Sequence, residues 1–136
     1  MDVSHLLDGL NAAQREAVSA PDGHHLILAG AGSGKTRVLT HRIAWLHEVV
    51  GVPTHGIFAV TFTNKAAGEM RHRIDAQLPS GSRGMWIGTF HGLAHRLLRL
   101  HHNEARLPES FQVLDSDDQL RLVKRVVQSL EIDDSK

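Results

Sequence analysis

The chain has 136 residues, with 15 Lys and Arg against 15 Asp and Glu, and it contains no cysteine. This length suits one domain that buries about two thirds of its unfolded surface, and the lack of cysteine excludes a disulfide framework and a thiolate metal site. The N-terminus lacks the regions of a signal peptide, and no apolar run approaches the ~20 residues of a membrane span. We therefore expect a soluble cytoplasmic protein with no membrane partner.

The charges are unevenly distributed along the chain. Residues 61–106 carry 7 basic and 3 acidic side chains, whereas residues 1–60 carry 4 and 5, and residues 109–136 carry 4 and 7. A basic excess in the middle of a neutral chain favours contact with an anion.

The first predicted element is a short helix over residues 12–18. Asn11 is a good N-cap, and residues 21–23 (Pro-Asp-Gly) end the helix before an apolar strand at 24–29. The Gln14 amide, with its acceptor and donors, is close enough in sequence to the following loop to reach an adenine edge. The alternative interpretation is a solvated Gln14 on a short helix.

A glycine-rich loop follows this strand and precedes a helix predicted over residues 36–50. Its sequence is Ala29-Gly30-Ala31-Gly32-Ser33-Gly34-Lys35-Thr36. In a phosphate-binding loop of this kind, backbone N–H groups and the positive end of the helix dipole hold a phosphate. Lys35 supplies a charge to the β- and γ-phosphates, and the Thr36 hydroxyl can hold Mg²⁺. Ala29 stands where the general pattern has Gly, which is tolerable if its φ stays negative.

The middle of the chain alternates strands and helices. Apolar strands are predicted over 57–62 and 85–89, and each is followed by a helix. Alternating elements indicate right-handed crossovers and a parallel sheet, and hence an α/β fold. The apolar positions expected to face inward in these helices are Leu39, Ile43, Leu46, Val50, Ala67, Met70, Ile74, Leu78, Leu93, Leu97 and Leu100.

The last third of the chain offers a weaker strand and a stronger helix. Residues 111–114 form a short apolar stretch that is a possible strand, and Asp115 then caps an amphipathic helix. The apolar positions of that helix are Leu120, Val123, Val127 and Leu130.

Two of the predicted strands, at 57–62 and 85–89, end in similar residues. Ligands gather at the carboxyl ends of strands in open α/β sheets, and each of these ends offers an aromatic ring, hydroxyl groups and a cationic group. This combination suits a single nucleic-acid strand, because rings stack on bases while polar groups hold phosphates. The alternative is that Phe62 and Phe90 belong to the core. The residues at these ends are Thr61, Phe62, Thr63, Asn64 and Lys65 at the first, and Thr89, Phe90 and His91 at the second.

Taken together, four motifs resemble the N-terminal part of the UvrD/Rep/PcrA group of superfamily 1 DNA helicases. Residues 10–18 are similar to the family's Q motif, 29–37 to motif I, 59–70 to motif Ia and 88–95 to motif Ib. The family carries Ala at the position of Ala29. The resemblance covers nearly the whole chain and implies a P-loop NTPase (RecA-like) fold that uses ATP and Mg²⁺.

The resemblance also implies residue roles. Gln14 would read adenine, residues 29–36 would hold the triphosphate, and Arg37 would lie beside the nucleotide. Phe62 would stack on a base of single-stranded DNA. The remaining residues of the implied DNA track are Thr63, Asn64, Thr89, Phe90 and His91.

The resemblance implies a division of the chain, with residues 1–91 in the ATP-binding motor domain and 92–136 at the start of an inserted helical subdomain. The parent would be an ATP-dependent 3′-to-5′ helicase of mismatch and nucleotide excision repair, with single-stranded DNA, DNA junctions and repair proteins as partners. The family's Asp-Glu motif, arginine fingers and second motor domain would lie after Lys136. We therefore expect no useful ATP hydrolysis and no unwinding by residues 1–136 alone.

Two other functions share some of these motifs. One is a helicase–nuclease subunit of the RecB or AddA type, which a downstream nuclease domain would distinguish. The other is a non-helicase P-loop switch protein, which would lack the segments at Phe62 and Phe90. The oligomeric state is open.

Overall fold

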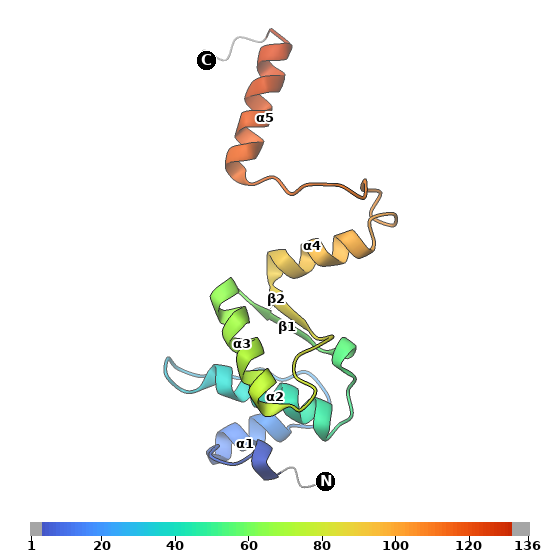
Figure 1. Cartoon of the computed structure of the whole chain (residues 1–136). Helices are drawn as coiled ribbons and strands as arrows, with labels where there is room; N and C mark the ends of the chain where they lie inside the picture. The colour runs from blue at the N-terminus through green and yellow to red at the C-terminus, as the bar shows by residue number, and fades with distance from the viewer. Residues whose placement is uncertain (1–3, 132–136) are drawn as a thin grey trace. The chain divides into compact units, whose positions relative to one another are not determined.

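The computed structural model describes residues 4–131 of the chain. The chain forms two compact units, one up to Ala94 and the other from His95 on. The elements, shown in Figure 1, are η1 (Ser4–Leu6), α1 (Ala12–Ser19), α2 (Lys35–Glu48), η2 (Thr54–Gly56), β1 (Phe58–Thr61), α3 (Asn64–Gln77), β2 (Trp86–Thr89), α4 (Phe90–Leu100) and α5 (Ser116–Ser129).

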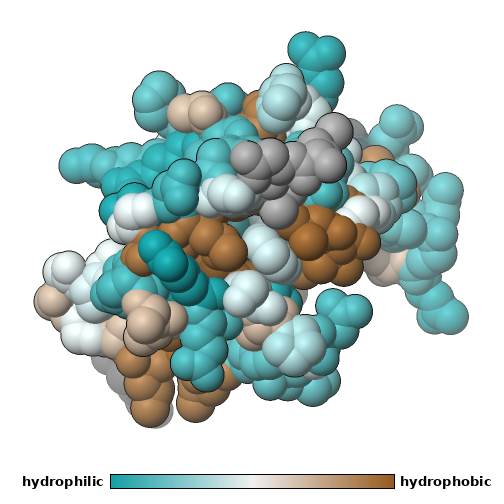
Figure 2. Space-filling view, turned by 90° about the horizontal axis from the view of Figure 1, so that it is seen from below, coloured by the Kyte–Doolittle hydropathy of each residue, from teal (hydrophilic) through white to brown (hydrophobic). Residues whose placement is uncertain are grey.

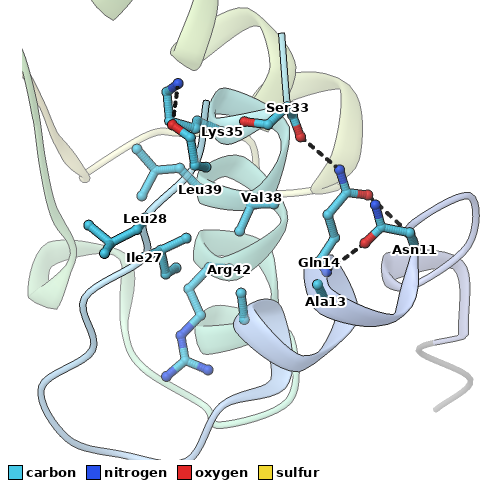
Figure 3. Close-up of a pocket in the computed structure, with 12 residues that line it drawn as sticks. Asn11, Ala13, Gln14, Ile27, Leu28, Ser33, Lys35, Val38, Leu39 and Arg42 are labelled. Carbon is cyan, nitrogen blue, oxygen red and sulfur yellow. Dashed lines mark hydrogen bonds between the residues drawn. The ribbon is translucent and has the colours of Figure 1, made fainter. Parts of the chain in front are cut away.

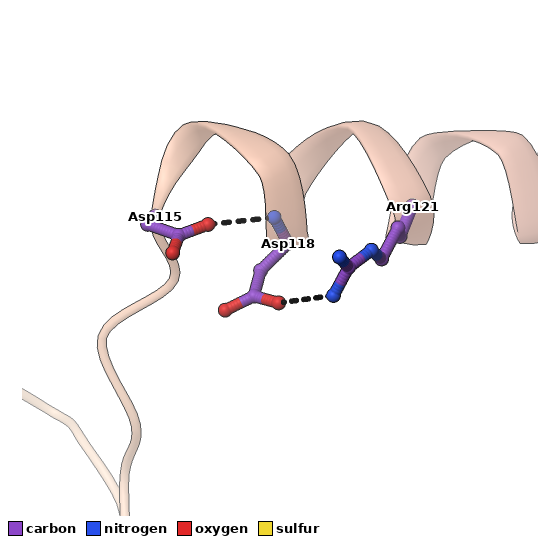
Figure 4. Close-up of polar contacts among 3 residues, drawn as sticks. All are labelled: Asp115, Asp118 and Arg121. Atoms are coloured by element: carbon purple, nitrogen blue, oxygen red, sulfur yellow. Dashed lines mark hydrogen bonds and ion pairs between the residues drawn. The ribbon is translucent and has the colours of Figure 1, made fainter.

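Side chains fix where three of the helices begin. Asn11 and Gln14 form a capping box at the start of α1, in which each side chain bonds the backbone N–H of the other. The Thr63 hydroxyl accepts from the N–H of Ala66 at the start of α3. In α5, a carboxylate oxygen of Asp115 accepts from the N–H of Asp118 at 2.8 Å, as Figure 4 shows. These local signals confirm the predicted starts of the three helices.

The first unit is built on a parallel pair of strands. β1 pairs with β2 in a register that places Phe58 opposite Trp86 and Thr61 opposite Thr89. α3 connects the two strands and buries the apolar stripe that its spacing predicts. The main core cluster joins the strands to α2, α3 and η1; its members are Leu6, Ile43, Ala44, Ile57, Ala59, Met70, Ile74, Leu78, Met85 and Ile87.

A second cluster joins α1 to α2. Leu10, Val18 and Val38 are buried there. Arg42 of α2 reinforces this contact, because its guanidinium donates to the carbonyl oxygens of Val18 at 2.8 Å and of Ala20. These carbonyls lie at the C-terminal end of α1, where no intrahelical donor is available to them.

The prediction of a strand at residues 24–29 is wrong for this structure. The segment is irregular, and the side chains of Leu26 and Leu28 are 85% and 87% exposed. A strand needs a neighbouring strand to complete its hydrogen-bond ladder, and the only ladder within residues 4–131 joins β1 to β2. The apolar stretch at 111–114 likewise forms no strand.

Several predicted inward positions are exposed. Leu39 and Val50 of the segment around α2 are 41% and 45% exposed, and Leu97 of α4 and Leu120 of α5 are about half exposed (49% and 54%). Their amphipathic spacing is real, but the described residues place little against these faces. Figure 2 shows brown apolar patches on the face of the chain that is seen from below. Among the described residues, no helix has both the length and the apolar content needed to cross a membrane.

Candidate functional site

The glycine-rich loop turns tightly into α2. Gly32 and Gly34 have φ angles of +73° and +82°, which side-chain-bearing residues rarely adopt. Ala29 is not among the described residues with positive φ, so its Cβ is compatible with the loop, as predicted. The Ser33 hydroxyl donates to the carbonyl oxygen of Gly30 at 2.7 Å and braces the turn.

The start of α2 differs from the starts of the helices described above. Gly34 is its N-cap and provides no side-chain hydrogen bond. The N–H groups of the first helical turn have no acceptor within the helix, and they carry the positive end of its dipole. This helix start is therefore open to an anion.

The Lys35 ammonium lies against the loop. It donates to the carbonyl oxygens of Ala29 at 3.0 Å and Gly30 at 2.7 Å. Lys35 and Thr36 are both exposed in the first turn of α2. The loop thus holds a cation beside the open helix start.

Gln14 reaches the loop from α1. Its amide nitrogen donates to the carbonyl oxygen of Ser33 at 3.0 Å, while its amide oxygen accepts from the N–H of Asn11. The side chain is therefore not merely solvated, in contrast to the alternative interpretation from sequence. The Arg37 guanidinium lies close to Gly9 in the turn before α1. A Cβ added to Gly9 would stand 2.8 Å from it.

A pocket of about 450 Å³ lies beside the loop. Gln14 and Ser33 border it with the Lys35 side chain, and apolar side chains form much of the remaining wall, as Figure 3 shows. Arg42 also lines it, a residue that the sequence analysis missed. The available signal was its spacing, since Arg42 is seven residues, or two helical turns, after Lys35 and lies on the same face of α2.

The groups around the loop fit a nucleoside triphosphate. An open helix start, an ammonium and a flexible hydroxyl suit phosphate oxygens and a hard cation. Cβ atoms added to Gly30 and Gly32 would meet nothing within 4 Å, so the space beside these two glycines is free.

A second group of predicted site residues meets at the carboxyl ends of β1 and β2. The rings of Phe62 and Phe90 have centroids 5.4 Å apart, and these side chains are 89% and 55% exposed. Both belong to the surface, which contradicts the core interpretation. The Thr89 hydroxyl accepts from the N–H of Gly92 as a cap for α4. Asn64 and His91 are exposed beside these ends.

Comparison with known protein families matches residues 10–136 to the UvrD/REP helicase N-terminal domain. The chain belongs to this family. It is 62% identical over its whole length to DNA helicase II of Escherichia coli strain K12, of which it covers 19%. It is 65% identical over 131 residues to DNA helicase II of Haemophilus influenzae, covering 93% of this chain and 18% of that relative. It is 46% identical over 133 residues to the ATP-dependent DNA helicase PcrA of Bacillus subtilis, covering 98% of this chain and 18% of that relative.

The match confirms the resemblance drawn from the four motifs. Within this UvrD/REP helicase N-terminal domain, both the loop and the exposed ring pair lie in the unit that ends at Ala94. The chain spans about a fifth of the length of these relatives.

Proposed function

We propose that this chain is the ATP-binding part of an ATP-dependent DNA helicase, in which ATP hydrolysis drives movement along single-stranded DNA and duplex unwinding. One observation carries the proposal. An open helix start with an adjacent ammonium shares a unit with an exposed ring pair at the ends of two parallel strands. Its relatives named as DNA helicases support the same assignment.

The nucleotide would bind along the loop at residues 29–36. Backbone N–H groups and the Lys35 ammonium would hold the phosphates, and the Thr36 hydroxyl would be a ligand of Mg²⁺. Gln14 would contact adenine, since its amide retains one donor and one acceptor site beyond its two hydrogen bonds. Arg37 would lie beside the nucleotide. Hydrolysis of the bound ATP would supply the free energy for movement along DNA.

Single-stranded DNA would lie across the ends of β1 and β2. Phe62 and Phe90 offer exposed rings on which bases stack. Thr63 and Thr89 lie at two helix starts, where the helix dipoles favour phosphate groups. Asn64 and His91 add polar groups at the same ends.

The wider proposal follows the family resemblance. Residues 1–91 would form the first part of a RecA-like motor domain with a P-loop NTPase fold, and residues 92–136 would begin a helical insertion. The complete protein would move 3′ to 5′, act at DNA junctions in mismatch and nucleotide excision repair with repair-protein partners, and reside in the cytoplasm.

Two substitutions in the complete protein test the proposal. Lys35→Ala should abolish ATP hydrolysis and weaken ATP binding while preserving affinity for single-stranded DNA. Phe62→Ala should weaken single-stranded DNA binding by about 1–3 kcal/mol, the contribution of one stacked base, while preserving ATP binding. Equilibrium titrations with a labelled nucleotide and a labelled oligonucleotide measure both affinities.

Phe58→Ala is the matched control for Phe62→Ala. Phe58 is also an exposed ring, 59% accessible, but it stacks on Trp86 at the opposite end of β1. Its removal should leave DNA affinity unchanged. Equal losses in the two variants, or no loss in Phe62→Ala, would remove the ring pair from the DNA track.

A further inference from the structure

We infer that Gln14 is a positioning residue for the phosphate-binding loop, in addition to any contact with a base. Its amide anchors the Ser33 carbonyl and thereby orients the N–H of Gly34, one of the backbone groups that would face a phosphate. This inference rests on the proposed nucleotide site, but it assigns Gln14 a role that does not require adenine.

The orientation of the Gln14 amide follows from its two partners. The N–H of Asn11 can only donate, so it faces the amide oxygen at 3.0 Å. The Ser33 carbonyl can only accept, so it faces the amide nitrogen at 3.0 Å. The amide is therefore held by two hydrogen bonds. Its oxygen bonds the start of its own helix, and its nitrogen bonds the loop 19 residues away.

The Ser33 contact determines how one peptide of the loop is turned. The carbonyl of Ser33 and the N–H of Gly34 belong to the same planar trans peptide and point in opposite directions. Figure 3 shows Gln14 and the Lys35 ammonium on opposite sides of Ser33. Holding the carbonyl toward Gln14 therefore turns the Gly34 N–H toward the side of the ammonium, where a phosphate would lie.

Glycine at position 34 leaves room for this contact. A Cβ at Gly34 would stand 3.0 Å from the Gln14 amide nitrogen, and the φ angle of +82° is itself unfavourable for other residues. Gly34 thus provides both the turn and the close approach of Gln14. The Gln14 amide thus couples the start of α1 to the start of α2.

Inorganic tripolyphosphate separates positioning of the loop from recognition of the base, because it contains the phosphates of ATP without adenosine. In the complete protein, Gln14→Met keeps the side-chain length and removes both hydrogen bonds. We expect the dissociation constant for tripolyphosphate to rise about three- to tenfold, the effect of one hydrogen bond. The dissociation constant for ATP should rise by at least as much. Isothermal titration calorimetry measures both.

Asn11→Ala is the matched control. It removes the side-chain cap of α1 but keeps the backbone N–H that bonds Gln14, so the contact with Ser33 remains. Tripolyphosphate affinity should stay within about twofold of the parent, well inside the effect of a lost hydrogen bond. A loss equal to that of Gln14→Met would overturn the inference, since any weakening of α1 would then suffice.

Gln14→Glu covers the case in which Gln14→Met does not fold. Glutamate preserves the capping box but replaces the donor to Ser33 with an oxygen, so it should also weaken tripolyphosphate binding. Parent-like tripolyphosphate affinity in either Gln14 variant, with only ATP weakened, would overturn the inference and leave Gln14 as a base reader. Unchanged tripolyphosphate binding in Lys35→Ala would instead contradict the proposed phosphate site itself.

Discussion

Asp75 shows how one exposed carboxylate fixes a turn. It lies near the end of α3, and one of its oxygens accepts from the backbone N–H of Ser82 at 2.6 Å. Hydrogen bonds from the Ser82 hydroxyl and then from the Ser82 N–H hold the pKa of Asp75 below its ordinary value of 3.8. The bonds connect α3 to the loop that leads to β2.

The lowered pKa of Asp75 predicts a small dependence of stability on pH. Ionised Asp75 stabilises the fold above pH 3.8, and this contribution disappears as the pH falls through the lower folded-state pKa. Because Asp75 is exposed, solvent screening keeps this contribution small. Carboxyl NMR titration should give a midpoint below 3.8 for Asp75, and Ser82→Ala should raise it. A midpoint unaffected by Ser82→Ala would contradict this assignment of the cause.

In the first unit, some helix starts have a side chain that accepts a hydrogen bond from a first-turn N–H group, and one start has none. Threonine hydroxyls of Thr63 and Thr89 bond N–H groups at the starts of α3 and α4, whereas Gly34 leaves the start of α2 without a side-chain cap. A capped start stabilises a helix, and an uncapped start keeps N–H groups available to a ligand. The difference distinguishes the nucleotide site from the strand ends.

Thr63→Ala should weaken the start of α3. Losing the cap costs about 1 kcal/mol, because the N–H of Ala66 loses its acceptor. Hydrogen exchange in the first turn of α3, measured by mass spectrometry without DNA, should accelerate about fivefold. Thr63→Ser retains the hydroxyl and should exchange like the parent. Identical acceleration in both variants would show that the methyl group, not the cap, stabilises this turn.

At the scale of the whole molecule, the core is concentrated in the first unit. Ile74 is fully buried between the strands and α2, whereas α5 contains no buried residue in its described part. Both tryptophans of the chain, Trp45 and Trp86, also belong to the first unit. Tryptophan fluorescence of this polypeptide therefore reports the unfolding of that unit.

Ile74→Ala should destabilise the first unit by about 2–5 kcal/mol, since it leaves a cavity in the main core cluster. Leu120→Ala, on the exposed face of α5, should change the same transition by less than about 0.5 kcal/mol. Urea unfolding followed by tryptophan fluorescence measures both. A comparable loss in Leu120→Ala would contradict the assignment of this transition to the core of the first unit.

The sequence by itself determined the features that depend on near neighbours in the chain. Caps at Asn11, Thr63 and Asp115, the buried stripe of α3 and the glycine-rich turn all follow from residues within about one or two helical turns of each other. The meeting of Phe62 with Phe90 was also predictable, because parallel strands end at the same edge of a sheet.

Only the tertiary structure decided which long-range partners exist. Residues 24–29 have the apolar composition of a strand but stay irregular, because a strand forms only where another strand completes its ladder. Leu39 and Leu97 have helical spacing but remain exposed, because burial depends on what packs against them. The Gln14 contact with Ser33 joins residues 19 apart. Such contacts depend on how the chain folds back on itself, which no local pattern specifies.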